Sequence, residues 1–411
     1  MIKLVLTLDC ILLIYSFFQF LRYFVFIISI NRKKIERTET NYDLVVVIPC
    51  FKEQKVIEKT IEYFNSILKK NISLVLVTTN KEKGLNTTKD IIERNIITKY
   101  PNTFLINYPY DDGMMADQLN YVIENINQYI PKDYVDNKTY FCVYNADSRP
   151  NRNTFKELDK EIANNFFPEF IQQYSYALSN FEQLNLVLKG FAIYQSNFEL
   201  KCGMLNSYFD SYLLHRHLVG HGLFVRLDVI KKINGFNTKF WCEDIYMSAV
   251  ANNLNYKIEP ILCLENMETP NKIIKLMKQN AVWFGTSNSH IKLYIDVFKS
   301  QKKISIRGIL GLVNEFRSSI NWLFFPFIIV FLFVSSIFLD IKYFIFSLIA
   351  YISYILIYSY TTIQIINKLE NKKIKYSIKM FISTFIATLI SNIGPLYFLI
   401  TKPKEKYKTE R

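Results

Sequence analysis

The chain has 411 residues, of which 50% are hydrophobic and 16% aromatic, so it is too long for one small domain and too apolar for a disordered protein. Its formal net charge is +14, with 50 lysines and arginines against 36 aspartates and glutamates. The basic residues flank apolar runs, at 32–37, 299–307, 368–379 and 402–411. Such positions orient a membrane protein and meet anionic lipid, so the charge indicates a lipid bilayer as partner and argues against nucleic acid.

Apolar runs of membrane-spanning length lie at both ends of the chain, at 4–30, 321–338, 343–360 and 380–400. A bilayer core needs about 20 apolar residues per helix. The first run is too long for the core of a signal peptide and lacks a small-residue cleavage site, so we expect a retained anchor over residues 1–30. We expect the other three runs to form a membrane region over residues 321–401, followed by a basic tail at 402–411.

Strand and helix patterns alternate after the anchor. An unbroken apolar run at 44–48 predicts a strand buried on both faces, and apolar residues at helical spacing follow over 56–68. Further strands are predicted at 73–79, 103–108 and 139–147, with helices near 87–99 and 114–129. The alternation predicts an α/β domain with a mostly parallel sheet over residues 40–290, whose ligands bind beyond the carboxyl ends of the strands.

Two acidic positions lie where such a site is expected. In "YNADSRP", Asp147 follows a strand directly and could hold a divalent cation, although an Asx turn before Pro150 would use the same residues. In "FWCEDIYMSAVANN", Glu243 and Asp244 precede a helical pattern. Carboxylates are favoured at any helix N-terminus, so this segment alone does not separate a helix cap from a catalytic acid.

Cysteines and histidines show no recognisable metal spacing. The six cysteines form no CxxC pair, which suits a reducing compartment, so we expect residues 31–310 to be cytosolic. His215 and His217 would share one side of a strand but not of a helix, and His221 follows them. We do not predict a metal site built from these histidines.

Several short motifs follow one another in a defined order. They are "PCFKE" with Pro49 and Glu53, "MADQLN" with Asn120, "YNAD" with Asn145 and Asp147, "GHG" with Gly220, His221 and Gly222, "CED" with Glu243 and Asp244, and "QNAVW" with Gln279 and Trp283. In the order and spacing of these motifs, and in the membrane helices that flank them, the chain resembles membrane-embedded family 2 glycosyltransferases. These are the inverting GT-A group that includes hyaluronan, cellulose, chitin and poly-N-acetylglucosamine synthases.

The resemblance implies a role for each motif. Asp244 would be the general base that takes a proton from the acceptor hydroxyl, supported by Glu243. Asp147 would bind Mg²⁺ or Mn²⁺ together with the diphosphate of a nucleotide-sugar donor. The remaining donor-binding residues would be Pro49, Glu53, Asn120 and Asn145, and the acceptor-binding residues Gly220, His221, Gly222, Gln279 and Trp283. Interface packing remains an alternative for Trp283, and a solvated helix face for Gln279.

The chain departs from the family pattern at several positions: Lys52 replaces Asn, Met115 replaces Lys, Asn145 replaces Asp, Cys242 replaces Thr and Val282 replaces Arg. After the second strand, "VTTNKEK" stands where relatives carry acids that contact the nucleotide base. These changes leave the sugar, the acceptor and processivity open. Transfer to a glycan in surface polysaccharide synthesis, transfer to a polyprenyl-phosphate or lipid-linked acceptor, and a non-catalytic nucleotide- or glycan-binding subunit all remain possible functions.

We expect a multi-pass protein of the cell membrane, and two further expectations concern its membrane region. Residues 300–320 carry an apolar stripe, Ile306, Ile309, Leu310, Val313 and Phe316, which predicts an amphipathic helix in the cytosolic interface, with a core helix as the alternative. Gly394 and Pro395 interrupt the last apolar run. Because an exported basic tail would oppose the positive-inside tendency, we predict that this run bends there and returns to the cytosolic face.

Overall fold

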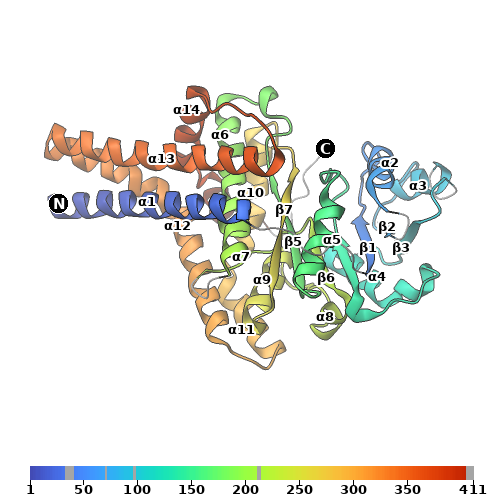
Figure 1. Ribbon diagram of the computed structural model, residues 1–411. Coiled ribbons are helices and arrows are strands. Elements are labelled where there is room, and N and C mark those ends of the chain that lie inside the picture. The colour runs from blue at the N-terminus through green and yellow to red at the C-terminus, as the bar shows by residue number, and fades with distance from the viewer. Residues whose placement is uncertain (33–40, 70–71, 96–98, 211–213, 404–411) are drawn as a thin grey trace.

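A seven-stranded sheet forms the centre of the computed structural model, which describes residues 1–32, 41–69, 72–95, 99–210 and 214–403. The strand order is β3-β2-β1-β4-β6-β5-β7 (Figure 1). β6 runs antiparallel to both of its neighbours, and the other neighbouring strands pair in parallel. The strands are β1 (Asp43–Pro49), β2 (Ile72–Thr79), β3 (Thr103–Tyr108), β4 (Thr139–Val143), β5 (Phe170–Tyr176), β6 (Leu223–Arg226) and β7 (Ile258–Asn266). The predicted mostly parallel α/β fold is confirmed.

Helices cover both faces of the sheet, because the central strands are apolar on both sides. Val45 and Val47 of β1 point into one core and Leu44, Val46 and Ile48 into the other, as the two-residue period of a strand requires. The first core is closed by α4 (Met115–Tyr129), α8 (Leu227–Lys232), α9 (Glu243–Leu254) and α11 (His290–Ser300). The second is closed by α2 (Ile57–Ile67), α3 (Thr88–Asn95) and α5 (Thr154–Asn164).

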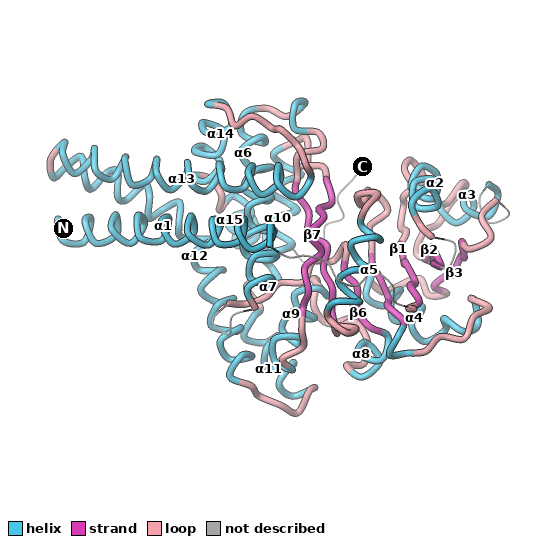
Figure 2. The backbone as a smooth tube through the Cα atoms, viewed as in Figure 1, coloured by secondary structure: helices cyan, strands magenta, loops and turns pink. Residues whose placement is uncertain are grey.

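A further group of helices joins the sheet to the apolar helices. These elements are α6 (Leu186–Asn197), a π-helix (Phe198–Met204), α7 (Leu205–Phe209) and α10 (Ile273–Ser287), with short 3₁₀ turns at Asp136–Lys138 and Phe181–Gln183 elsewhere. Their buried side chains share one core with Tyr174 and Tyr176 of β5, Leu264 of β7 and Ile363 of the apolar helix α13 (Ile341–Glu370). This group of helices therefore lies between the sheet and the apolar helices and packs against both (Figure 2).

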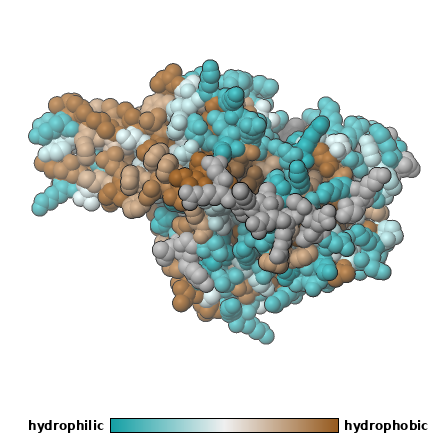
Figure 3. All heavy atoms as spheres, viewed as in Figure 1, coloured by the Kyte–Doolittle hydropathy of each residue, from teal (hydrophilic) through white to brown (hydrophobic). Residues whose placement is uncertain are grey.

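The helices α1 (Ile2–Arg32), α12 (Ile306–Leu339) and α13 project together from one side of the molecule (Figure 1). Apolar surface gathers over this projection (Figure 3). Together with the segment Ile378–Thr401, they are the four described segments that are long and apolar enough to cross a membrane. The four predicted apolar runs are thus all helical.

The predicted amphipathic segment at 300–320 is part of α12 from Ile306 onward, and α12 continues without a break through the span at 321–338. Ser300 is the last residue of α11, and a non-helical connection follows it. The predicted apolar stripe faces outward, since Ile306 is 75% exposed and Val313 is 56% exposed. The opposite side of the same turns, with Gly311 and Glu315, is buried against the sheet domain. An exposed apolar stripe next to a spanning segment is what an interfacial position requires, and that position remains a prediction.

The last apolar run is broken into α14 (Ile378–Leu389) and α15 (Ile393–Thr401). The break comes a few residues before the predicted position, and two hydrogen bonds join it to α12: the indole of Trp322 donates to the Ser391 carbonyl at 3.0 Å, and the side chain of Asn392 donates to the Leu323 carbonyl at 2.9 Å. α15 then packs closely on α10, because Gly394 brings its backbone against Asn280. The last helix therefore lies against the layer that joins the sheet to the apolar helices, and its return to the cytosolic face remains a prediction. Tail residues 404–411 lie outside the described residues.

Candidate functional site

The loop after β1 is held in a fixed shape by a buried acid. Lys52 has a left-handed backbone, with φ at 57°, and its N–H donates to the carboxylate of Glu82 at 2.9 Å. The N–H of the buried Glu53 donates to the Thr88 hydroxyl at 2.9 Å, and that hydroxyl donates in turn to Glu82 at 3.2 Å. Glu82 is the one acid of the segment "VTTNKEK". It accepts hydrogen bonds from the backbone and side chains around the end of β1.

The predicted metal-binding segment forms a tight turn at the end of β4. The N–H of Asn145 donates to the Ser148 hydroxyl at 3.1 Å, and the N–H of Ser148 donates to the Asn145 carbonyl at 3.0 Å. Thr60 of α2 donates to the Ala146 carbonyl. Asn145 is half-buried and Asp147 is exposed at the tip of the turn. The turn is closed by the backbone and by the Ser148 hydroxyl, and it leaves Asp147 exposed at its tip.

The structure brings "GHG" and "CED" together. Asp244 lies in the first turn of α9, and its Oδ2 accepts the N–H of Gly220 at 2.8 Å while its Oδ1 accepts the N–H of Ile245 at 2.8 Å. Glu243 is buried and Asp244 is half-buried. A Cβ on Gly220 would lie 3.3 Å from Glu243 Oε1 and 3.4 Å from Asp244 Oδ2, so a small residue here allows the loop to approach both acids closely.

A buried charged network connects this loop to the turn after β4. His221 Nδ1 lies 3.1 Å from the carboxylate of Glu265 at the end of β7, and His221 Nε2 lies 3.7 Å from Glu199 in the π-helix. The other oxygen of Glu265 accepts the N–H of Arg149 at 2.8 Å. Glu265 thus bridges the segment that carries Asp147 and the segment that contacts Asp244.

The pKa values of this network favour its charged form. Burial opposes the charge on His221, but the contacts with Glu199 and Glu265 outweigh it and hold the pKa of His221 well above its ordinary value. Burial also opposes the charge on Glu265, but His221 and the N–H of Arg149 lower the pKa of that carboxyl. Because both ring nitrogens face carboxylates, His221 positions the loop, and contact between His221 and an acceptor remains a prediction.

Two other predicted residues take part in packing between segments. Asn120 on α4 accepts the N–H of Phe236 at 2.7 Å and donates to the Phe236 carbonyl at 2.8 Å. Gly235, with φ at +77°, lies so close that a Cβ there would stand 2.3 Å from Asn120 Oδ1. Asn120 thereby fixes the chain that leads from β6 to α9. Gly222, with φ at +60°, lies against Gln173 of β5 in the same way.

The predicted acceptor residues Gln279 and Trp283 lie one turn apart on α10 and are both half-buried. Gln279 Oε1 is buried and accepts no hydrogen bond from the part of the chain that the structure describes. Gly285 of the same helix packs on Phe398 of α15, where a Cβ would meet the ring at 2.7 Å. α10 is therefore fixed against the C-terminal helix, and binding of a sugar by Gln279 and Trp283 remains a prediction.

Sequence reasoning missed three buried acids that organise the site: Glu82, Glu199 and Glu265. Glu265 had a usable signal, since an acid inside the apolar strand "ILCLEN" requires a buried partner. Glu82 and Glu199 lie in polar or mixed segments where nothing in the local pattern separates a buried acid from an exposed one.

No protein-family model and no curated protein sequence matches the chain. Among solved structures it is similar to the mannosyltransferase PcManGT from Pyrobaculum calidifontis in complex with GDP-Man and Mn²⁺, with a TM-score of 0.50 and 13% identity, covering 97% of this chain and 100% of that chain. It is more weakly similar to S. aureus TarS 1-349 in complex with UDP-GlcNAc, with a TM-score of 0.46 and 10% identity, covering 87% of this chain and 92% of that chain. The first similarity shows a glycosyltransferase-like fold.

Proposed function

We propose that this protein is a membrane-bound glycosyltransferase that moves a sugar from a nucleotide-sugar donor to a glycan acceptor with inversion. The observation that carries the proposal is the Asp244 carboxylate at the start of α9, held by the Gly220 N–H next to the buried Glu243. Inverting transfer needs one carboxylate that accepts a proton from the attacking hydroxyl, in a fixed position beside the acceptor. A half-buried carboxylate oriented by two backbone N–H groups meets that need.

The donor would lie at the carboxyl ends of β1 and β4, where parallel strands leave a binding crevice. The carboxylate of Asp147 and the amide oxygen of Asn145 are hard oxygen donors, and they fit Mg²⁺ or Mn²⁺. When bound, such an ion would neutralise charge on the diphosphate leaving group. With one carboxylate in the turn, much of the charge that holds the ion would come from the donor itself.

The buried network gives this arrangement its rigidity. Glu265 joins the Asp147 turn to His221, and the neighbouring Gly220 contacts the proposed base. Donor and acceptor sides are thus held in one frame, and fixed geometry is a large part of what a transferase contributes to rate.

The test is an assay of nucleoside-diphosphate release from a panel of UDP- and GDP-sugars by the full chain in membranes or detergent, with Mg²⁺ or Mn²⁺. We expect one nucleotide sugar to give release that depends on the metal and on added acceptor. Binding of a nucleotide sugar without release, across a full acceptor panel, would indicate a non-catalytic binding subunit.

If release requires an extracted lipid fraction and soluble glycans are inactive, the acceptor is lipid-linked.

A further inference from the structure

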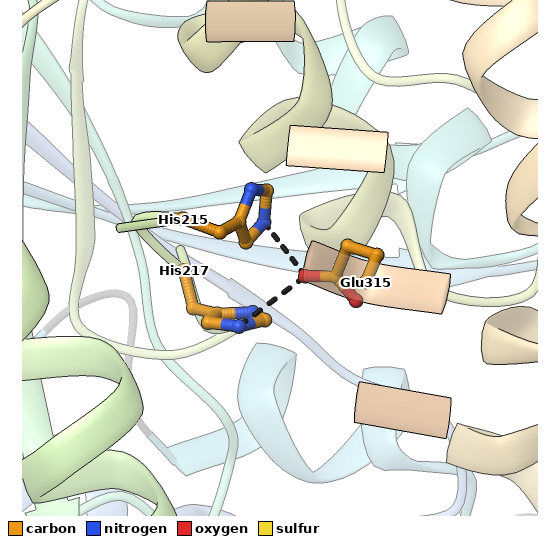
Figure 4. A group of neighbouring side chains, drawn as sticks. All are labelled: His215, His217 and Glu315. Atoms are coloured by element: carbon orange, nitrogen blue, oxygen red, sulfur yellow. Dashed lines mark ion pairs between the residues drawn. The ribbon is translucent and has the colours of Figure 1, made fainter. Parts of the chain in front are cut away.

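A second cluster of titratable groups lies between the sheet domain and α12, apart from the Asp147 turn. His215 and His217 come from the extended segment that leads to Gly220, and Glu315 comes from α12 (Figure 4). His215 Nε2 lies 2.7 Å and His217 Nε2 lies 3.2 Å from the same oxygen of Glu315. The three ligand atoms all lie within 4.8 Å of one another. His215 and His217 are separated by one residue, and their rings lie on one side of the segment, 4.5 Å apart between ring centroids.

Packing holds both sides of this cluster in place. Arg216, between the two histidines, points away, and its guanidinium donates to Asp210 at 2.8 Å. On the helix side, Gly311 lies one turn before Glu315, and a Cβ there would meet the hydroxyl of Tyr294 at 2.7 Å and His215 Nδ1 at 3.2 Å. α12 can therefore approach the histidines closely.

Two of the atoms in these short contacts are not aligned for a hydrogen bond. His215 Nε2 and Glu315 Oε1 are both buried, yet within the described chain neither makes a contact with hydrogen-bond geometry. The nitrogen and oxygen atoms are close together without being aimed at each other, as ligand atoms around a shared centre are.

We propose that His215, His217 and Glu315 bind one divalent transition-metal ion of the Zn²⁺ type. Two imidazole nitrogens and one carboxylate oxygen form a donor set that Zn²⁺ takes in proteins, leaving a further position for water. His290 Nε2 lies 3.1 Å from the second oxygen of Glu315, and within the described chain it also makes no contact with hydrogen-bond geometry. The oxygen donors at Asp147 have a different preference, for Mg²⁺ or Mn²⁺.

The ion would link the segment that leads into Gly220 to the membrane-facing helix α12. Glu315 lies 98 positions after His217 in the sequence, so binding closes a long loop and stabilises the docking of α12 on the sheet domain. The inference does not depend on glycosyl transfer, since it concerns a separate set of side chains.

The test uses the full chain purified in detergent, stripped with chelator and titrated with Zn²⁺. Metal content after desalting should reach about one ion per chain, and X-ray absorption should show nitrogen and oxygen ligands at about 2.0–2.1 Å. His217→Gln and Glu315→Gln should each lower the affinity for Zn²⁺ at least tenfold. His221→Gln is the matched control, because it removes a buried histidine of the same loop that is paired with other carboxylates, and it should keep Zn²⁺ binding.

Wild-type protein that binds no Zn²⁺ after reloading would overturn the proposal, as would sulfur ligands at about 2.3 Å, which would place the metal on cysteines. Equal Zn²⁺ affinity in wild type and in both ligand variants would overturn it too. If the ligand variants do not fold, the absorption spectrum of Co²⁺-loaded wild type decides: a visible ligand-field band without a thiolate charge-transfer band supports the site, and its absence refutes it.

Discussion

Removing the charge of Glu265 tests the buried network that joins the two halves of the site. Glu265→Gln keeps the size of the side chain and an oxygen that can accept the Arg149 N–H, which lies 2.8 Å from Glu265 in the structure. The variant leaves the protonated His221 without its nearest counter-charge. Breaking a buried ion pair from one side costs about 3–5 kcal/mol. Because Glu199 still lies 3.7 Å from His221, we expect the lower end, about 3 kcal/mol.

The loss should depend on pH in one direction. The folded-state pKa of His221 is raised, so the pair contributes its full stability below the ordinary histidine pKa of about 6.5 and loses it as pH rises through the folded value. Glu265, whose folded pKa is lowered, stays ionised throughout this range. The difference in unfolding temperature between wild type and Glu265→Gln should therefore be largest near pH 6 and shrink toward pH 9.

The assay is thermal unfolding of the detergent-solubilised chain across that pH range. Glu259→Gln is the matched control, since it makes the same change on the same strand but breaks an ion pair with the half-exposed Lys257. We expect that control to cost less than about 1 kcal/mol. A Glu265→Gln effect that equals the control, or that does not change with pH, would refute the reasoning.

Three further predictions concern the Gly235 contact, the Asp147 metal site and the exposed stripe of α12. Gly235→Ala should destabilise the protein by about 1–3 kcal/mol, measured by thermal unfolding, because the new Cβ would overlap Asn120 Oδ1 at 2.3 Å; an unchanged unfolding temperature would contradict this. Excess EDTA should abolish transfer through the Asp147 site, and Mg²⁺ or Mn²⁺, but not Zn²⁺, should restore it; undiminished transfer in EDTA would rule this out. Spin labels at Ile309 and Val313 should show depth-dependent contact with lipid, and labels that report only water would exclude an interfacial stripe.

Strong local patterns predicted the first four strands, whereas β5, β6 and β7 were not predicted. The strand at 103–108 agrees with β3, and the apolar run at 44–48 lies within β1, because an unbroken apolar run is hard to satisfy except in a buried strand. β6 has only four residues and pairs antiparallel with β4 and β5. Its direction depends on those neighbouring strands, so it could not be predicted from so short a segment.

The break in the last apolar run was predicted, but its position was not. Pro395 lies in the first turn of α15, where its missing N–H would have no helical partner, so proline begins the second helix there without breaking it. The break itself falls at Ile390–Asn392, where the indole of Trp322 donates to the Ser391 carbonyl and the side chain of Asn392 donates to the Leu323 carbonyl. Trp322 and Leu323 lie on α12, about 70 positions away, and no local pattern reveals them.

The site shows the same division. Gly220 and Asp244 were predicted from separate motifs, and the structure joins them by a hydrogen bond. Glu265 and Glu315 were not predicted, because a carboxylate in a strand or a membrane-adjacent helix gains its meaning from partners distant in sequence. His215, 100 positions from Glu315, could be paired with it only after the fold placed α12 against the loop.

The identity of the base is the central claim, and the turnover of Asp244→Asn tests it most directly. Asparagine keeps the size and most hydrogen bonding but cannot accept the proton, so nucleoside-diphosphate release should fall by roughly 10²–10⁴-fold while nucleotide-sugar binding and folding are retained. Asp228→Asn, another acid in the first turn of a helix, is the control and should keep near-normal turnover. Near-normal release by a folded Asp244→Asn variant would show that Asp244 only caps its helix and that the account of the base is wrong.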